Sequence, residues 1–370
     1  LLRNIPCASA KLYTRLDHEE QQCFRKLFFA DASYDVFVEG PIDFVDEVGS
    51  IAYGIIDQVG ITVRVGYSKA SLIKEFTDPK QVIDKMVTVV GPHEAPVFMY
   101  TDSLSSLLEK KYYQYVPVHV IRIMYPLFRG SLVPSAVVER LNQHFDMIVV
   151  PDPYYVEIYK NSGVTKPIFC IPMGLYLEAL LAMPIKQEQG KPYTFGCVAK
   201  KGAASNVKKL IDAFYQQYGN NSDFQLKLNV KESMELFYEE TGEEYVSKLG
   251  ATNIQITDEE MESTEYVNFL RSVDCYVLLS ASEAFSNTPR EALAIGIPCI
   301  ISNNTAHKTI CDTGFVMPVE CPDAIDVHRE VLDLAVGKQY NCRIPDVIDA
   351  MNEVVCNYDV HKQRALQGRE

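Results

Sequence analysis

Residues 280–301 read S-A-S-E-A-F-S-N-T-P-R-E-A-L-A-I-G-I-P-C-I-I and predict a polar turn, a short helix and the start of a strand. The apolar run at 275–279 comes directly before them and predicts a buried strand. Pro289 is expected as the first helical residue, because the missing N–H of proline costs nothing there. The helix is then expected over 290–295, and the next strand over 298–302.

Two carboxylates stand across this strand–turn–helix junction, Glu283 in the turn and Glu291 in the first turn of the helix. In an open α/β sheet, ligands bind beyond the carboxyl ends of the strands. The N–H groups at a helix start also favour an anion, typically a phosphate. The stretch therefore predicts an anion-binding site. A purely structural role is the alternative for both acids, since acids near a helix start commonly stabilise the helix.

Length and composition limit the class of protein. The 370 residues predict two domains. Hydrophobic residues at 47% and charged residues at 23% are typical of a globular protein. The formal net charge of −14 argues against a nucleic-acid partner and against attraction to anionic membranes. No apolar run approaches the roughly 20 residues of a spanning helix, so we expect no transmembrane segment, and we see no signal peptide.

The ten cysteines do not form the spacing patterns of a metal or redox site. Cys170, Cys197, Cys275 and Cys299 fall inside strand-like apolar runs, where a thiol behaves as a small buried hydrophobe. There is no C-x-x-C pair and no Cys/His cluster with zinc spacing. A reducing compartment, and hence a cytoplasmic location, is the prediction.

Elsewhere along the chain, strand-like and helix-like segments alternate, which predicts parallel sheets built from βαβ units. Before residue 182 the expected strands are 34–38, 61–65, 87–90, 97–100, 118–124, 147–150 and 168–171, and the expected helices include 17–30, 44–59 and 80–85. After it the further expected strands are 193–199, 224–230, 254–257 and 314–319, and the further helices are 206–218, 232–249, 262–272, 323–336 and 345–357.

Residues 183–192, M-P-I-K-Q-E-Q-G-K-P, interrupt the alternation with a polar stretch bounded by prolines. Such a stretch is typical of a domain linker. The predicted fold class is therefore α/β, with one Rossmann-like βαβ domain over 1–182, a second over 193–370, and a central cleft that both face.

The motif at 283–302 resembles a signature of the retaining, nucleotide-sugar-dependent glycosyltransferases of GT-B fold, the family that includes sucrose synthase and bacterial mannosyltransferases. That signature is E-x-F-G-x-x-x-x-E-A-x-A-x-G-x-P-V-I-x-S. Here Glu283, seven residues and Glu291 are followed by A-L-A-I-G-I-P-C-I-I-S. Gly163-Val164, I-P-M-G at 171–174 and L-I-D-A-F at 210–214 are also similar to family stretches, so the resemblance covers residues 145 to 320.

The resemblance implies an enzyme that moves a sugar from a nucleotide-diphospho-sugar to an acceptor hydroxyl with retention of anomeric configuration. It implies no cofactor and no metal, because lysines and helix dipoles would balance the diphosphate charge. Glu283 and Lys201 are the expected catalytic residues, and Glu291 is expected to bind the ribose hydroxyls. The remaining expected donor-binding residues are Lys200, Ser286, Asn287, Thr288, Ile256 and Thr257, with Lys201 among them as well.

The chain departs from the family pattern in the loop after the first strand of the second domain. Lys200 stands at the family's Arg position and Ser205 at its Lys position, and Lys201 or Lys208 is a candidate substitute. Ala284 and Ser286 replace two glycines of the family's loop.

The acceptor is expected on the N-terminal domain, which lacks the family's H-x-H-like motif. M-Y-T-D at 99–102 occupies that place, so Tyr100 and Asp102 are acceptor-side candidates, together with Arg122 and Ser50. Arg122 lies in an apolar strand, where an arginine needs a partner, and a structural role is equally open. In retaining transfer without a protein nucleophile, the departing phosphate itself can accept the proton of the acceptor hydroxyl.

Three rival functions remain open at this point. A sugar-nucleotide epimerase of the same fold would need an acid/base set that acts on the sugar ring, and no such set stands out. A catalytically silent nucleotide-sugar-binding protein is favoured by Ser205. A two-lobed solute-binding protein is disfavoured by the absence of a signal peptide. The sugar, the base, the acceptor and the oligomeric state cannot be read from the residues.

Overall fold

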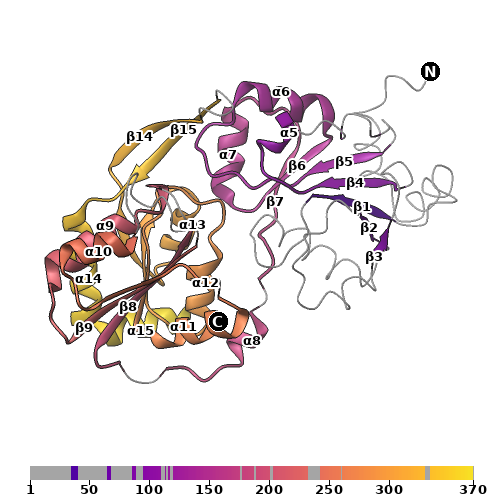
Figure 1. Cartoon of the computed structure of the whole chain (residues 1–370). Coiled ribbons are helices and arrows are strands. Elements are labelled where there is room, and N and C mark those ends of the chain that lie inside the picture. Colours follow the sequence, from indigo (N-terminus) through magenta and orange to yellow (C-terminus); the bar gives the residue numbers. More distant parts are fainter. Residues whose placement is uncertain are drawn as a thin grey trace, which may run out of the picture. The chain divides into compact units, whose positions relative to one another are not determined.

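The protein is described by a computed structural model covering residues 35–40, 65–67, 86–88, 95–109, 113, 116, 120–175, 177–186, 189–200, 203–231, 242–259, 261–329 and 334–369. The expected helices at 17–30, 44–59 and 80–85 lie outside these residues. The chain forms two compact units (Figure 1). Unit 1 comprises residues 1–128, 132–175 and 328–336, and unit 2 comprises 129–131, 176–327 and 337–370. The expected linker, 183–192, belongs to unit 2.

Unit 1 is built on a seven-stranded parallel sheet with the order β3-β2-β1-β4-β5-β6-β7. The order reverses between β1 and β4, so the chain moves outward from this point in both directions, as in a doubly wound fold. The strands are β1 (Val36–Glu39), β2 (Val65–Tyr67), β3 (Met86–Thr88), β4 (Val97–Tyr100), β5 (Ile121–Met124), β6 (Met147–Val150) and β7 (Ile168–Cys170).

Aromatic side chains fill much of the core of unit 1. Tyr100, Tyr113 and Phe145 are almost completely buried, and the rings of Tyr113 and Phe145 lie 5.6 Å apart between centroids. Asp152 begins a helix by accepting the N–H of Tyr154 at 3.0 Å, with a proline in the first turn. The helices of this unit are α5 (Ser106–Glu109), α6 (Ser135–His144) and α7 (Pro153–Asn161).

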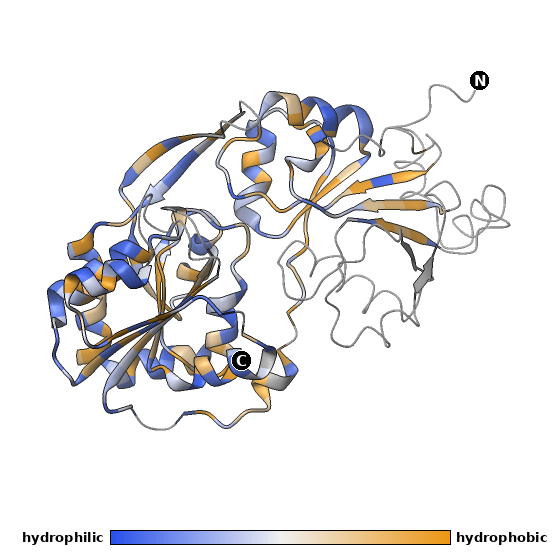
Figure 2. Ribbon diagram, in the orientation of Figure 1, coloured by the Kyte–Doolittle hydropathy of each residue, from blue (hydrophilic) through white to orange (hydrophobic). Residues whose placement is uncertain are grey.

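Unit 2 repeats the doubly wound order with a six-stranded parallel sheet, β10-β9-β8-β11-β12-β13, which reverses between β8 and β11. Its strands are apolar runs because a parallel sheet is covered on both faces, and Figure 2 shows this hydrophobic character along them. The strands are β8 (Tyr193–Lys200), β9 (Phe224–Lys231), β10 (Ile254–Thr257), β11 (Cys275–Leu278), β12 (Cys299–Asn303) and β13 (Met317–Glu320).

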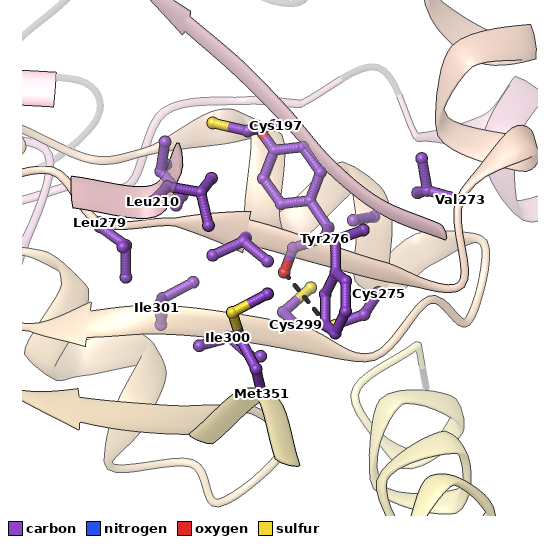
Figure 3. Packing of buried hydrophobic residues seen from close by; sticks show 14 of the residues in the cluster. Cys197, Leu210, Val273, Cys275, Tyr276, Leu279, Cys299, Ile300, Ile301 and Met351 are labelled. Carbon is purple, nitrogen blue, oxygen red and sulfur yellow. Dashed lines mark hydrogen bonds between the residues drawn. The ribbon is translucent and has the colours of Figure 1, made fainter. Parts of the chain in front are cut away.

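Helices cover both faces of this second sheet. In Figure 1, α9 and α14 lie together on one face and α11 and α12 on the other. Figure 3 shows Leu210, Tyr276, Ile300 and Met351 among the buried hydrophobic residues of this unit. The helices are α8 (Glu178–Leu181), α9 (Val207–Tyr218), α10 (Gly242–Leu249), α11 (Ser263–Ser272), α12 (Asn287–Ala294), α13 (His307–Cys311), α14 (Ile344–Cys356) and α15 (Tyr358–Gln367), with a short 3-10 helix, η5 (Ala203–Ser205).

The expected helix at 323–336 is wrong. The chain forms two strands there, β14 (Asp323–Arg329) and β15 (Leu334–Asn341), which make a separate two-stranded sheet. The β-branched residues Ile325 and Val327 alternate with polar neighbours, which is the period of a strand rather than of a helix. Each expected strand that has a counterpart in the two parallel sheets begins and ends within four residues of that counterpart.

The short helix after the opening turn begins earlier than expected. α12 starts at Asn287, so Pro289 is its third residue and not its first. The difference arises because Ser286 adopts a left-handed conformation, with φ of 70°, and turns the chain into the helix sooner. Proline is still tolerated at this position, since the first four N–H groups of a helix have no partner within it.

No helix among the described residues is long and apolar enough to cross a lipid bilayer.

Candidate functional site

The switch point of unit 2 brings two loops together at the carboxyl ends of β8 and β11. The loop after β11 begins at Leu279, and its Ala281 N–H donates to the Ala204 carbonyl of η5 at 2.7 Å. The side-chain amide of Asn206 donates to the Leu279 carbonyl at 2.8 Å and is buried. These bonds hold the loop that carries Glu283 against the loop that follows β8, at the edge where doubly wound sheets bind ligands.

Glu283 is buried and fixed through its backbone. Its N–H donates to the Thr305 hydroxyl at 2.8 Å. Its carboxylate lies 3.7 Å from the guanidinium of Arg129, a residue of the short segment 129–131 that belongs to unit 2. Because Arg129 precedes Glu283 by more than 150 residues and sits in no motif, the sequence offered no signal for this contact.

Glu291 is half-buried in the second turn of α12 and accepts a hydrogen bond of 2.5 Å from the phenol of Tyr266 in α11. Burial, followed by the neighbouring negative charge of Glu291, raises the pKa of the Tyr266 phenol well above its usual 10. The phenol is therefore a permanent donor that orients this carboxylate. Sequence reasoning missed Tyr266, because a tyrosine in a helix that packs on a sheet is usually a core residue.

The first residues of α12 are Asn287 and Thr288, both half-buried. In the sheet, the phenol of Tyr276 in β11 donates to the Val198 carbonyl of β8 at 3.1 Å, which joins the two central strands. The first N–H groups of α12 have no acceptor within the helix.

Ser286 lies directly before this helix start, but its hydroxyl does not point away from the protein. It is buried, and its Oγ lies 2.8 Å from Nε2 of His307, a fully buried residue of α13 that sequence reasoning also missed. Ser286 can therefore contact the sugar donor only through its backbone.

Ile256 and Thr257 end β10, at the same carboxyl edge, with Ile256 half-buried and Thr257 exposed. The buried side chain of Asn229 in β9 donates to the Thr257 hydroxyl at 3.1 Å and to the Glu259 carbonyl at 2.9 Å. The Oδ1 atom of Asn229 has no hydrogen-bond partner.

The lysines expected near the diphosphate are placed as follows. Lys200 is the last residue of β8, and Lys201 lies outside the described residues. Ser205 ends η5 and is half-buried. Lys208 is directed to α9 and α10, where its ammonium pairs with Asp212 at 3.4 Å and lies 3.7 Å from the ring centre of Tyr245. The positive charge of Lys208 is therefore paired with Asp212 and Tyr245 on the surface of the protein.

The acceptor-side candidates lie in unit 1, except that Ser50 is outside the described residues. The phenol of Tyr100 is completely buried and donates to the Ser106 hydroxyl at 3.0 Å. Asp102 is also buried, and its Oδ1 accepts the Ser103 N–H at 2.6 Å. The structure brings Tyr100 and Asp102 together, with 3.5 Å between the phenol and Oδ2, but both groups serve the interior of the unit.

Arg122 forms a buried ion pair with Asp146. Its Nε and Nη2 atoms donate to the two carboxylate oxygens, each at 3.1 Å, and its backbone N–H donates to Oδ2 at 2.9 Å. Both residues are less than one-tenth exposed. These contacts favour the structural role over contact with a substrate.

Among the described residues, no group of three or more histidine, cysteine, aspartate and glutamate side chains is placed to hold a metal ion.

One family model matches the chain. Residues 182–334, less than half of it, match the model described as Glycosyl transferases group 1. The match identifies a group 1 glycosyl transferase domain in this segment. No curated protein matches the chain in sequence.

Solved structures resemble the chain over nearly its whole length. HepE from Anabaena in complex with UDP and glucose is 9% identical with a TM-score of 0.65, over 91% of this chain and 94% of that one. Sucrose-phosphate synthase from Thermosynechococcus elongatus is 14% identical with a TM-score of 0.62, over 90% and 93%. A glycosyltransferase from Rickettsia africae ESF-5 is 12% identical with a TM-score of 0.63, over 91% and 92%. At these identities the likeness shows the fold, so the predicted GT-B fold with two Rossmann-like domains is confirmed.

Proposed function

We propose that the protein is a retaining glycosyltransferase, which moves a sugar from a nucleotide-diphospho-sugar to an acceptor hydroxyl without a metal ion or cofactor. One observation carries the proposal: the start of α12, Glu283 and Glu291 come together at the carboxyl edge of the sheet, beside its switch point. The group 1 match over residues 182–334 and the fold it shares with HepE support it.

The start of α12 provides the diphosphate site. Negative charge grows on the diphosphate as the bond to the sugar breaks, and fixed N–H donors aimed at those oxygens stabilise it. The N–H groups of Asn287 and Thr288 supply such donors, and the helix dipole adds to them. Lys200, the last residue of β8, and Lys201, which follows it, add positive charge.

The two carboxylates bind two further parts of the donor, the ribose and the transferred sugar. Glu291, oriented by the Tyr266 phenol, accepts hydrogen bonds from the ribose hydroxyls. Glu283, fixed through Thr305 and close to Arg129, binds hydroxyls of the transferred sugar near its reacting carbon. Ile256 and Thr257, at the end of β10, border the nucleobase.

The acceptor hydroxyl attacks the anomeric carbon of the bound donor. The new bond between its oxygen and the anomeric carbon forms on the face from which the diphosphate leaves. The proton of the hydroxyl passes to the departing phosphate oxygen, so no protein base is required. Retention of configuration follows from attack on that same face.

Turnover with a panel of nucleotide sugars tests the proposal. UDP-glucose is the first donor to try, because the similar structure of HepE is known in complex with it. Release of the nucleoside diphosphate is measured with and without candidate acceptor sugars, and the anomeric configuration of any product is read by proton NMR. An inverted product contradicts retention, and the absence of both binding and turnover across the panel contradicts the whole proposal.

A second candidate function is a nucleotide-sugar-binding protein without turnover. It is favoured by Ser205, which stands where the family has a lysine, and by Lys208, whose ammonium is occupied by Asp212 and Tyr245. Tight binding of a nucleoside diphosphate, together with no release of nucleoside diphosphate from any sugar donor, supports this second function over the first.

A further inference from the structure

The loop between β11 and α12 contains a backbone conformation that its residue does not favour. Ser286 has φ of 70° and ψ of 87°. A side chain with a Cβ atom is disfavoured in this left-handed region, which glycine enters freely. Ser286 is also buried, so its hydroxyl needs a partner inside the protein. Something in the surrounding structure must therefore hold both the backbone and the hydroxyl of this residue.

His307 is that partner, and its hydrogen bonds define its tautomer. Nδ1 of the ring lies 3.1 Å from the Ser302 carbonyl, which can only accept, and 3.0 Å from the Ser302 hydroxyl. Because that hydroxyl donates its own hydrogen to the Ser280 carbonyl, it also accepts here, so Nδ1 carries the hydrogen. In the neutral ring, Nε2 is then an acceptor, and the Ser286 hydroxyl, 2.8 Å away, donates to it. The ring is completely buried, which fixes its orientation.

The same short segment, residues 302–307, holds the β11–α12 loop at two further points. The Ser302 hydroxyl donates to the Ser280 carbonyl at 2.6 Å, at the beginning of the loop. The Thr305 hydroxyl accepts the N–H of Glu283 at 2.8 Å, in its middle. The contact of His307 with Ser286 is the last of the three, directly before the first N–H groups of α12.

We propose that His307 is a positioning residue for the nucleotide site. It does not touch the substrate; it holds Ser286 in the left-handed conformation that directs the N–H groups of Asn287 and Thr288 toward the diphosphate. This inference rests on the proposed donor site, and it assigns a role to a residue outside the paired-glutamate motif.

A second buried histidine of unit 2 provides a matched control. His361 in α15 is 3% exposed, and its Nε2 lies 3.4 Å from a carboxylate oxygen of Glu353 in α14, away from the loop. Replacing either histidine with alanine removes a buried ring from the same unit. A general loss of packing would therefore affect both variants, whereas a positioning role belongs to His307 alone.

The test measures the affinity of UDP, GDP and ADP for the full chain by calorimetry. We expect His307→Ala to weaken the best binder about tenfold, since a buried hydroxyl loses its acceptor. His307→Gln, which keeps an acceptor near the position of Nε2, is expected to restore most of the affinity. His361→Ala is expected to leave it unchanged. Where a sugar donor turns over, His307→Ala raises the donor KM more than it lowers kcat.

The double variant S286G/H307A provides the most discriminating measurement. Glycine adopts the left-handed conformation without help and has no hydroxyl to satisfy, so it removes both reasons for the histidine. The double variant is therefore expected to bind the nucleotide more tightly than His307→Ala alone. Equal or weaker binding by the double variant overturns the inference, as does an equal loss of affinity in His361→Ala.

Amide hydrogen exchange keeps this result separate from the proposed function. In the ligand-free chain, we expect residues 280–291 to exchange about tenfold faster in His307→Ala than in the wild type, and at the wild-type rate in His307→Gln and His361→Ala. If no diphosphate binds the wild type, the proposed function fails, and exchange alone decides on the role of His307. Unchanged exchange in His307→Ala overturns that role.

Discussion

The carboxyl edges of the two sheets have the same strand order around their switch points, yet they use their polar residues differently. In unit 1, Tyr100 and Asp102 bond to each other and to their own turn, and Arg122 is paired with Asp146. In unit 2, the polar side chains hold a loop and a helix start in place, and the carboxylates of Glu283 and Glu291 lie at that edge. The same topology thus supports a core in one unit and a candidate donor site in the other.

A polar residue is therefore not assigned to a binding site by its position at the carboxyl edge of a sheet alone. Every group predicted on the acceptor side and described in the structure is satisfied by the interior of unit 1. A role of unit 1 in binding an acceptor must then depend on other residues or on backbone groups. Variants that separate effects on stability from effects on nucleotide affinity test this difference between the two units.

The largest effect is expected at the buried ion pair of unit 1. Arg122→Ala leaves the carboxylate of Asp146 buried without its partner, which costs about 3–5 kcal/mol of the free energy of unfolding. Urea denaturation measures this loss, and nucleotide affinity under native conditions is expected to stay at the wild-type value. A variant of unchanged stability whose acceptor KM rises would instead place Arg122 in the acceptor site.

The next effect is expected at Glu291. Glu291→Ala removes charge-assisted hydrogen bonds to the ribose, each worth about 1.5–3 kcal/mol, so the Kd of a nucleoside diphosphate rises by roughly one to two orders of magnitude. Calorimetry measures it, with Glu139→Ala, an exposed acid of α6, as the control for the change in net charge. An unchanged Kd in Glu291→Ala would remove this residue from the donor site.

A smaller effect concerns the other end of the same helix. The Lys362 ammonium of α15 is buried and donates to the carbonyl of Gly296, just after α12. Burial, helped by the positive charge of Lys186, lowers the pKa of Lys362 from 10.5 to about 8. Between pH 8 and 10.5 the unfolded chain then binds more protons than the folded one, so the contribution of this residue to stability rises with pH.

The difference in unfolding free energy between wild type and Lys362→Met is the quantity to measure. It is expected to shift in favour of the wild type by about 1–2 kcal/mol from pH 7.5 to 10.5, after allowance for solvent screening. Taking the difference removes the titration of tyrosines and cysteines, which is common to both proteins. A difference that does not change with pH would show that Lys362 titrates at its ordinary value in the folded chain.

Local patterns predicted the sheets well and the supporting contacts poorly. Apolar runs such as 275–279 are strands because both faces of a parallel sheet are covered, and that requirement is visible in the sequence itself. The placement of Glu283 and Glu291 around one turn followed from the same local reading. The helix expected at 323–336 is wrong because the two-residue spacing of Ile325 and Val327 indicates a strand, and the chain there forms the paired strands β14 and β15.

The residues that sequence reasoning missed act through partners distant in the chain. His307 contacts Ser286 across 21 positions, Tyr266 contacts Glu291 across 25, and Arg129 contacts Glu283 across 154. Arg122 was expected to need a partner, but only the fold identifies Asp146 as that partner. A single sequence indicates which residues need an interaction partner, and the fold determines which residue that partner is.

The smallest effect is expected at Tyr266, and the chain provides its own control. The phenols of Tyr266 and Tyr245 each donate to a carboxylate at 2.5 Å, the first to Glu291 at the candidate site and the second to Asp212 on the surface of α9. Each Tyr→Phe change removes a hydrogen bond to a carboxylate, worth about 0.5–1.5 kcal/mol. Tyr266→Phe is expected to raise the nucleotide Kd about two- to tenfold, because the Glu291 carboxylate loses its orientation, whereas Tyr245→Phe leaves it unchanged. Equal Kd values for the two variants would mean that Glu291 needs no second residue to orient it, and the role of α11 would then be confined to packing.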